Sequence, residues 1–269
     1  MSRLEDFHSD LLAVKRDGDL LWVTLDDPDR ANALSPALID TLTTLYSSNL
    51  RQEGIRAVLL QAEGKHFSAG ADLEHLRSLQ SAGPEENQED SARLRARFES
   101  VLRQEALTLA LVRGACVAGG CGLATAHDFV VAEEQARFMY SEVRIGFVAA
   151  LVATYLPLRL SGAHIRELLL NPEFVSAERA LEVGLVNRLV PVGELSAAGR
   201  DLAVEVLERA SSESIARTKR LLLDIVGQPL DLALEIAVGA NAEARSTADC
   251  QHGISTFLES KAPPNWRER

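Results

Sequence analysis

The stretch LVRGACVAGGCGLATAHDF, residues 111–129, decides the fold, because glycines and alanines stand where packing side chains would be expected. Its first part, LVRGACV, predicts a strand, and a helix is predicted from about Gly120 to Ala126, after the glycine run begins. A further strand is predicted at DFVVA, residues 128–132. Strand and helix alternate in this way in βαβ-type crossovers, so we expect an α/β fold with a mixed or parallel sheet covered by helices.

The segments before the glycine run agree with this fold class. LLAVKRDGDLLWVTL, residues 11–25, predicts a β-hairpin that turns at its Asp-Gly pair. A helix is predicted after Ser35, with Ser35 as its N-cap and Pro36 in its first turn. RAVLLQA, residues 56–62, predicts a short buried strand, and another helix is predicted from Ala71.

The segments on either side of the glycine-rich stretch set the predicted domain organisation. SAGPEENQED, residues 81–90, is polar and contains Gly and Pro, which predicts a mobile loop or lid. A long helix is predicted through residues 91–110, and the chain is almost wholly helical after Pro191. We therefore expect an αβ core that carries the active site over residues 1–195 and a helical C-terminal region over residues 196–269.

Charge and hydrophobicity exclude several classes of function. The chain has 269 residues, of which 46 % are hydrophobic, and its formal net charge is −11. Nucleic-acid binders gain affinity by placing a basic face on phosphates, so this net charge argues against a nucleic-acid partner. The longest apolar run, residues 145–158, contains Pro157 and falls short of the roughly 20 residues that span a bilayer. The N-terminus lacks the pattern of a secretory signal, so we expect a cytoplasmic protein outside the membrane.

The cysteines do not indicate a metal site or a disulfide framework. Cys116, Cys121 and Cys250 are odd in number, and the first two have no His or Asp at the spacing of metal ligands. We expect neither zinc nor disulfide bonds.

The glycine run has three familiar explanations. A Walker phosphate loop requires Lys and then Ser or Thr after its second glycine, whereas Gly120 and Cys121 follow Gly119. A dinucleotide fingerprint would begin at Gly120, but Thr125 stands at its third glycine position and no suitable acidic residue follows. The third explanation is structural, since paired glycines permit a strand and a helix to pack tightly.

A second stretch of the same character favours a functional explanation. GKHFSAGADLEHL, residues 64–76, also places small residues where a buried strand gives way to a helix. N–H groups at two such junctions can converge on one point and stabilise negative charge that develops there. Such a pair of donors is an oxyanion hole, and losing one donor typically costs about 2.7–4 kcal/mol of transition-state stabilisation.

Four motifs together resemble the crotonase superfamily, the enoyl-CoA hydratases and isomerases. They are HFSAGADL (66–73), VAGGCGLATAHD (117–128), SEVRIGF (141–147) and VSAERALEVGLVNRLVP (175–191). The resemblance covers nearly the whole chain and implies a spiral core of ββα units with a C-terminal helical trimerisation region. It also implies a homotrimer or a dimer of trimers. The substrate would be an acyl-CoA thioester, with coenzyme A as part of the substrate and no separate cofactor.

The resemblance assigns roles to individual residues. The backbone N–H groups of Ala71 and Gly119 would form the oxyanion hole that holds the thioester oxygen while an enolate forms. Arg30 and Lys261 would meet CoA phosphates, Lys261 by reaching a neighbouring subunit, although both could also be solvated surface charges. The substrate-binding residues implied in this way are Arg30, Ala69, Gly70, Asp72, Leu73, Gly120 and Lys261.

The sequence departs from the two-glutamate pattern of well-studied hydratases in this family. Gly122 occupies the position of the first glutamate, and only Glu142, in SEVRIGF, matches the second. Burial at an apolar pocket wall would raise the pKa of this carboxyl group, which suits proton transfer near neutrality. Further candidates for a second acid or base are Asp72, Glu74, His75 and Tyr140, among which the sequence does not choose.

One carboxylate is compatible with more than one reaction. It can activate water and return the same proton to an enolate, which is hydration of a 2-enoyl-CoA or the reverse dehydration. It can also move a proton from C2 to C4, which isomerises a 3-enoyl thioester to a 2-enoyl thioester. We expect hydration first, from the overall resemblance to hydratases, and isomerisation second. A third alternative is a catalytically weak acyl-CoA-binding scaffold that has lost its first acid.

Overall fold

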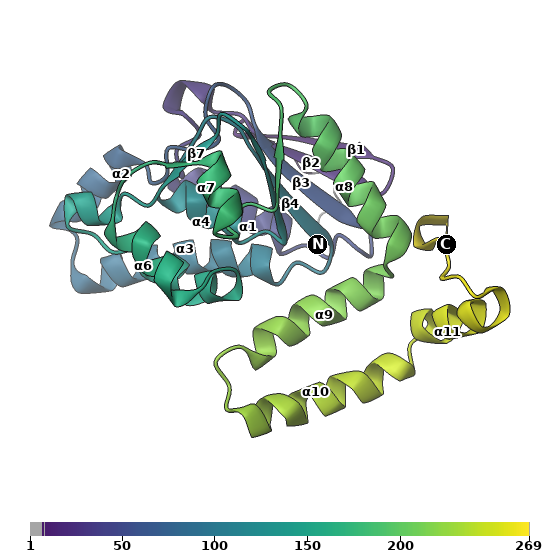
Figure 1. Cartoon of the computed structure of the whole chain (residues 1–269). Coiled ribbons are helices and arrows are strands. Elements are labelled where there is room, and N and C mark those ends of the chain that lie inside the picture. Colours follow the sequence, from purple (N-terminus) through teal and green to yellow (C-terminus); the bar gives the residue numbers. More distant parts are fainter. Residues whose placement is uncertain (1–6, 8, 269) are drawn as a thin grey trace.

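A six-stranded sheet forms the centre of the computed structural model, which describes Phe7 and residues 9–268 (Figure 1). The strand order is β1-β2-β3-β4-β6-β9. β1 pairs antiparallel with β2, and every later neighbour is parallel, so the predicted mixed sheet is confirmed. The bounds are β1 Leu12–Asp17, β2 Leu20–Leu25, β3 Ala57–Ala62, β4 Leu107–Val112, β6 Phe129–Glu133 and β9 Arg188–Val190.

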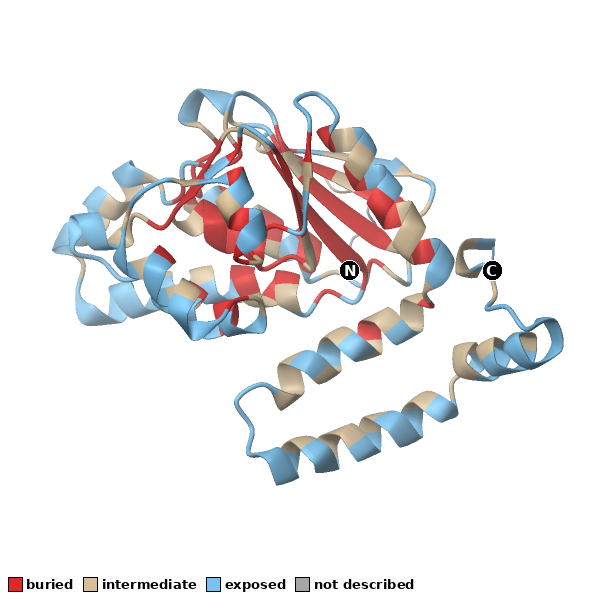
Figure 2. Cartoon of the chain, viewed as in Figure 1, coloured by how far each residue is buried: buried red, intermediate tan, exposed pale blue. Residues whose placement is uncertain are grey.

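Helices cover both faces of this sheet and create two separate cores. In β3, Val58 and Leu60 belong to the core shared with α1 (Pro36–Tyr46). Leu59 points the other way and joins the core shared with α8 (Leu195–Arg209). This alternation follows from the two-residue period of a strand. Figure 2 shows the resulting band of buried strands between half-buried helices.

A small second sheet lies beside the first and carries the chain into the glycine run. Its strand order is β5-β7-β8, with β5 at Ala115–Val117, β7 at Arg137–Met139 and β8 at Val175–Ser176. β5 follows β4 after a turn at Gly114, where a Cβ atom would lie 2.0 Å from the carbonyl oxygen of Lys65. Only glycine fits there, so this turn brings the strand that precedes α4 (Gly119–Thr125) against the segment around residue 65.

The predicted helix start at Ser35 is confirmed, whereas the predicted loop over residues 81–90 is wrong. The Ser35 side chain accepts a hydrogen bond from the N–H of Leu38, as an N-cap does. α3 runs over Pro84–Leu102, with Gly83 as its N-cap residue, so most of the supposed lid is helical. Proline at the first helical position and two glutamates in the first turn are helix-start signals, and they outweighed the polar composition.

The long helix predicted through residues 91–110 ends earlier than expected. α3 stops at Leu102, and the apolar residues that follow form the central strand β4. All six residues of β4 are buried. A short run of apolar residues that is buried on both faces has no period that separates strand from helix, which explains the error.

The C-terminal helices divide into one that belongs to the core and three that leave it. α8 lies against the sheet, so the first part of the predicted helical region packs with the core. α9 (Ser212–Ile225), α10 (Leu230–Arg245) and α11 (Ala248–Ser260) form an arm that extends away from the sheet (Figure 1). Residues 1–6 and 8 of the first predicted domain, and residue 269 of the second, lie outside the described residues.

Candidate active site

The two small-residue junctions lie directly against each other. Ser68 forms a parallel bridge with Cys116, and the N–H of Val117 donates to the carbonyl of Ser68 at 3.0 Å. A Cβ atom on Gly70 would lie 2.7 Å from the Val117 carbonyl oxygen and 3.3 Å from the nitrogen of Gly119. Gly70 has φ +87°, a conformation that side chains rarely adopt. The two stretches of small residues are therefore adjacent in the fold.

Gly119 and Gly120 have different neighbours. A Cβ atom on Gly120 would come within 2.8–2.9 Å of three atoms of Ser68, so this glycine permits the close contact between α4 and the Ser68 segment. A Cβ atom on Gly119 would meet only the Cδ1 of Leu34, at 3.1 Å. Gly120 is thus required for packing, while Gly119 is the first residue of α4 and lies beside Gly70.

The backbone N–H groups of Ala71 and Gly119 are both available for a ligand. Gly119 is the first residue of α4, and the first N–H groups of a helix have no acceptor within it. Ala71 bridges Leu34 in parallel, a pairing in which the N–H of Ala71 itself points away from Leu34. Within the described chain, neither group donates a hydrogen bond to another residue. The site therefore presents two unsatisfied donors from adjoining segments.

Strain accompanies the turn into α4. Ala118 has φ 48° and ψ −121°, which is unusual for a residue with a side chain. Its N–H donates to the carbonyl of Met139 at 2.7 Å, so the end of β7 holds this turn in place. Backbone conformations of this kind persist where the surrounding structure imposes them, and they concentrate at functional sites.

Glu142 follows closely on the same strand end. It opens a short 3-10 helix, η4 (Glu142–Ile145), three residues after Met139. Three residues span at most about 11 Å, so Glu142 stays near the turn that Met139 holds. Its Oε2 atom is buried and has no hydrogen-bond partner among the residues described. Burial raises the pKa of this carboxyl group above its ordinary value.

Other side chains already fill the space beside Gly122. A Cβ atom at this position would lie 2.7 Å from Cγ2 of Val152, 3.0 Å from Cζ of Phe98 and 3.1 Å from the hydroxyl of Tyr155. A longer side chain could enter only if these neighbours moved. The sequence showed that a glutamate is missing here, but it did not show that bulky residues occupy its place.

Comparisons with known proteins agree over almost the full length. The family model described as enoyl-CoA hydratase/isomerase matches residues 15–269. The chain belongs to this family. It is similar to the "Putative enoyl-CoA hydratase" of Thermus thermophilus, with 42 % identity over 91 % of this chain and 97 % of that one. The crystal structure of an enoyl-CoA hydratase from Mycobacterium smegmatis has 30 % identity and a TM-score of 0.87, covering 96 % of this chain and all of that one.

A more specialised relative matches as well. The cyclohexa-1,5-dienecarbonyl-CoA hydratase of Thauera aromatica is 27 % identical over 95 % of this chain and 96 % of its own. The fold of the enoyl-CoA hydratase/isomerase family is therefore established for this α/β chain, and acyl-CoA chemistry is established at the level of the family.

Two of the four other candidate acid/base residues in this family member, Asp72 and His75, are engaged with other residues. Asp72 caps α2 (Leu73–Ser78) by accepting hydrogen bonds from the N–H groups of Glu74 and His75. His75 pairs with Asp90 of α3, with 2.6 Å between its Nε2 and the carboxylate oxygen. Glu74 is exposed, and Tyr140 is buried.

The predicted CoA-binding residues fall into two groups. Those of the first stretch lie together: Arg30 pairs with Asp27 at 2.9 Å and with Asp72 at 3.4 Å, and the N–H of Ala69 donates to the carbonyl of Ala31 at 2.9 Å. Leu73, at the start of α2, is 75 % exposed. Lys261 is different, because it is the C-cap residue of α11, and Figure 1 shows α11 on the opposite side of the molecule from α2. Within one chain, Lys261 does not join the other site residues.

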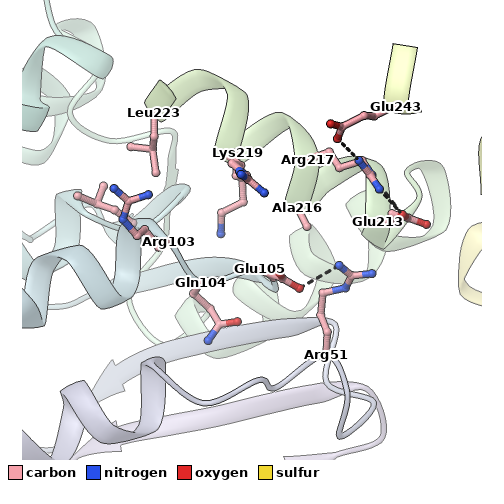
Figure 3. A pocket seen from close by; sticks show the side chains of 12 residues that line it. Arg51, Arg103, Gln104, Glu105, Glu213, Ala216, Arg217, Lys219, Leu223 and Glu243 are labelled. Atoms are coloured by element: carbon pink, nitrogen blue, oxygen red, sulfur yellow. Dashed lines mark hydrogen bonds and ion pairs between the residues drawn. The ribbon is translucent and has the colours of Figure 1, made fainter. Parts of the chain in front are cut away.

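A charged cavity lies apart from this site. Its volume is about 410 Å³, and it lies where α9 and α10 face the end of α3 (Figure 3). Arg51 pairs with Glu105 at 3.1 Å, and Arg217 pairs with Glu213 and Glu243 at 3.1 and 3.3 Å. Neither Glu142 nor the two N–H donors line it. Among the described residues, no group of three or more His, Cys, Asp or Glu side chains could hold a metal ion.

No described helix is long and apolar enough to cross a membrane.

Proposed function

We propose that this protein hydrates a 2-enoyl-CoA thioester, or dehydrates the corresponding 3-hydroxyacyl-CoA, with Glu142 as its only carboxylic acid/base. The observation that carries the proposal is the buried Oε2 atom of Glu142, which has no partner among the described residues. A carboxyl group that is partly buried, raised in pKa and left with one oxygen without a partner suits proton transfer to and from a substrate. The adjoining N–H groups of Ala71 and Gly119 supply the complementary electrostatic element.

The reaction follows from these two parts. The thioester oxygen accepts hydrogen bonds from the N–H groups of Ala71 and Gly119, which draws electrons from the conjugated double bond. Glu142 removes a proton from water as the oxygen adds to C3, and the electron pair of the double bond moves to form the enolate. Glu142 then returns that proton to C2, which regenerates the thioester carbonyl. Water is consumed, no other reactant is needed, and dehydration is the same path in reverse.

Isomerisation is the alternative, and the filled space beside Gly122 favours it. A two-carboxylate site needs room for a second acid, whereas Val152, Phe98 and Tyr155 occupy that space. Moving a proton from C2 to C4 of a 3-enoyl thioester needs only one carboxylate and the same stabilised enolate. The hydratase names of the compared relatives support hydration, so we place isomerisation second.

Two substrates separate these reactions from a binding scaffold. Conjugated enoyl thioesters absorb in the ultraviolet, so hydration of crotonyl-CoA lowers this absorbance and isomerisation of 3-hexenoyl-CoA raises it. We expect a loss with crotonyl-CoA. A gain with 3-hexenoyl-CoA alone would identify an isomerase. Binding of both thioesters without any change in absorbance would contradict both enzymes and favour the scaffold.

Replacing Glu142 by Gln tests the proposed acid/base. The amide keeps the shape of the side chain but cannot accept and return a proton, so turnover should fall by about 10² to 10⁴. The affinity for the thioester, measured by calorimetry, should change little. The matched control is Glu173→Gln, because the Glu173 side chain is 70 % exposed and its one ion pair within the described part of the chain is with Arg144. Equal turnover in Glu142→Gln and the control would refute this role.

A further inference from the structure

The first turn of α4 has little intrinsic stability. Three of the seven residues of this helix are glycines, at positions 119, 120 and 122, and glycine is among the weakest helix formers. No side chain of the described residues caps its N-terminus. The donor N–H of Gly119 therefore needs another source of rigidity, because a useful donor must lie within about 2.7–3.1 Å of the developing oxyanion.

The last carbonyl groups of α4 supply that rigidity. The hydroxyl of Tyr155 donates to the carbonyl of Gly122 at 2.8 Å, and Nδ1 of His127 lies 2.8 Å from the carbonyl of Leu123. Nε of Arg159 donates to the carbonyl of Thr125 at 3.0 Å. All three side chains donate to carbonyl groups in the last turn of α4. A carbonyl group there either lacks the usual backbone partner within the helix or can accept a second hydrogen bond.

His127 is itself fixed by a buried tyrosine. Its Nδ1 must carry the proton, since a carbonyl oxygen can only accept, so Nε2 of the neutral ring accepts from the hydroxyl of Tyr46 at 2.8 Å. Burial holds the pKa of His127 well below its ordinary value and keeps the ring neutral. The guanidinium of Arg97 lies over the Tyr46 ring, 4.5 Å from its centre, and is fully buried. All of these groups are in the interior and none is used by the proposed reaction.

We propose that Tyr155 and the Tyr46–His127 pair are positioning residues, which hold α4 by its last carbonyl groups and thereby fix where Gly119 presents its N–H to the thioester oxygen. This inference rests on the proposed function, because it assumes that the N–H of Gly119 is an oxyanion donor. Each hydroxyl bonds to a buried partner and acts on Gly119 through the helix. Loss of one contact lets α4 shift at its last turn, and a shift along the helix displaces Gly119 as well.

The test measures carbonyl polarisation as well as turnover. Butyryl-CoA is saturated and cannot be hydrated, so the infrared stretching frequency of its bound thioester carbonyl reports the strength of the two hydrogen bonds directly. In the native protein this frequency should be lower than in free butyryl-CoA. Tyr46→Phe and Tyr155→Phe, which remove one hydroxyl each, should reduce this lowering. They should also reduce kcat for crotonyl-CoA by about tenfold, with less than about a twofold change in KM.

Variants of His127 provide a rescue experiment. Asparagine places an amide N–H close to where Nδ1 lies, so His127→Asn retains a donor for the Leu123 carbonyl, whereas His127→Leu retains none. His127→Asn should therefore keep more of the carbonyl shift and of kcat than His127→Leu. Equal losses of kcat and of the carbonyl shift in the two variants would contradict a positioning role for the hydrogen bond from His127 to the Leu123 carbonyl.

A matched control separates positioning from general stability. Thr24→Val removes a buried hydroxyl that accepts from Gln61 at 3.1 Å on β2 and β3, away from α4. It should lower the unfolding temperature but leave the carbonyl frequency and kcat as in the native protein. If the tyrosine variants behave like this control, the positioning role of Tyr155 and the Tyr46–His127 pair is overturned, while the proposed function stands. If the carbonyl frequency of butyryl-CoA is not lowered in the native protein, the proposed oxyanion hole is contradicted, and so is the positioning role that depends on it.

Discussion

At position 122, three neighbouring side chains leave no room for a second carboxylate. The missing side chain of Gly122 leaves no vacant space, because Val152, Phe98 and Tyr155 close over the position at 2.7–3.1 Å from a built Cβ atom. Adding a glutamate alone therefore cannot create a two-carboxylate site. In the proposed reaction, Glu142 and the two N–H donors therefore carry the chemistry without a second carboxylate.

Gly122→Ala should destabilise the protein although alanine is the better helix former. The gain in helix propensity is about 1 kcal/mol, but overpacking a closed interior typically costs about 1–3 kcal/mol. We expect a net loss of up to about 2 kcal/mol, measured by chemical unfolding. Gly162→Ala is the control, since its Cβ would meet only the end of the Arg166 side chain, at 3.4 Å. A more stable Gly122→Ala variant would show that the neighbours yield easily.

Glu142→Gln should have opposite effects on activity and on stability. The pKa of Glu142 is raised by burial, so the folded state favours the protonated form and is destabilised, relative to the unfolded state, once the pH rises through the folded pKa. Glutamine removes this cost. The variant should unfold at a higher temperature than the native protein at pH 8, and the difference should vanish below the ordinary pKa of glutamate. A lower unfolding temperature at pH 8 would indicate that the carboxylate stabilises the fold.

The sequence names candidate residues but not their surroundings. The resemblance to the family points to Glu142, Ala71 and Gly119, because each belongs to a short continuous motif. Nothing local connects Gly122 with Phe98 or Tyr155, which are 24 and 33 residues away along the chain. Such contacts depend on how α3 and α5 (Ala150–Tyr155) pack on α4, and packing of this kind is not encoded in any short pattern.

At the scale of elements, the same residues can signal a loop or the start of a helix. Gly83 and Pro84 predict a loop by their residue types, yet they are the N-cap and first residue of α3. Ser35 and Pro36 predict the start of a helix correctly, because an apolar helical period follows them. α3 begins with a polar turn instead, and its buried residues appear only near its end, at Arg97, Phe98, Ser100 and Val101. The helical period was therefore too distant to guide the prediction of its start.

The His75–Asp90 contact connects α2, which follows the donor Ala71, with α3. Asp90→Asn should weaken this contact and loosen α2, which begins at Leu73, one of the residues expected to bind the substrate. A partly exposed pair contributes up to about 1 kcal/mol, so KM should rise by up to about fivefold. Glu99→Gln is the control, because the described ion pairs of Glu99 are with Arg95 within α3 and with Arg103 at its C-cap. An unchanged KM for Asp90→Asn would mean that α2 is held by its own cap.

At the scale of the whole molecule, the C-terminal arm exposes apolar side chains that a single chain does not cover. Figure 2 shows α10 and α11 with exposed and half-buried residues along their length. Large apolar patches of this kind mark interaction surfaces. The side chains more than half exposed on the arm are Leu222, Leu230, Leu234, Val238, Ile254, Phe257 and Leu258.

We expect copies of the same chain to cover this arm, in a homotrimer or a dimer of trimers. The resemblance to the family supports this assembly, and it would also explain why Lys261 lies far from the site of its own chain. Leu234 and Val238 are four residues apart on α10 and so share one face of the helix. Changing both to Glu should place like charges in the interface and release monomers.

Light scattering coupled to gel filtration measures this change directly. The native chain should have the mass of three or six copies, and Leu234→Glu/Val238→Glu should approach the mass of one with unchanged helix content by circular dichroism. Glu235→Gln, on the same helix, should leave the mass unaltered. If the arm supplies Lys261 to a neighbouring site, the monomer should also bind acyl-CoA more weakly, because each site loses a cation for the CoA phosphates. A native chain that is already monomeric would contradict both the assembly and the role of Lys261.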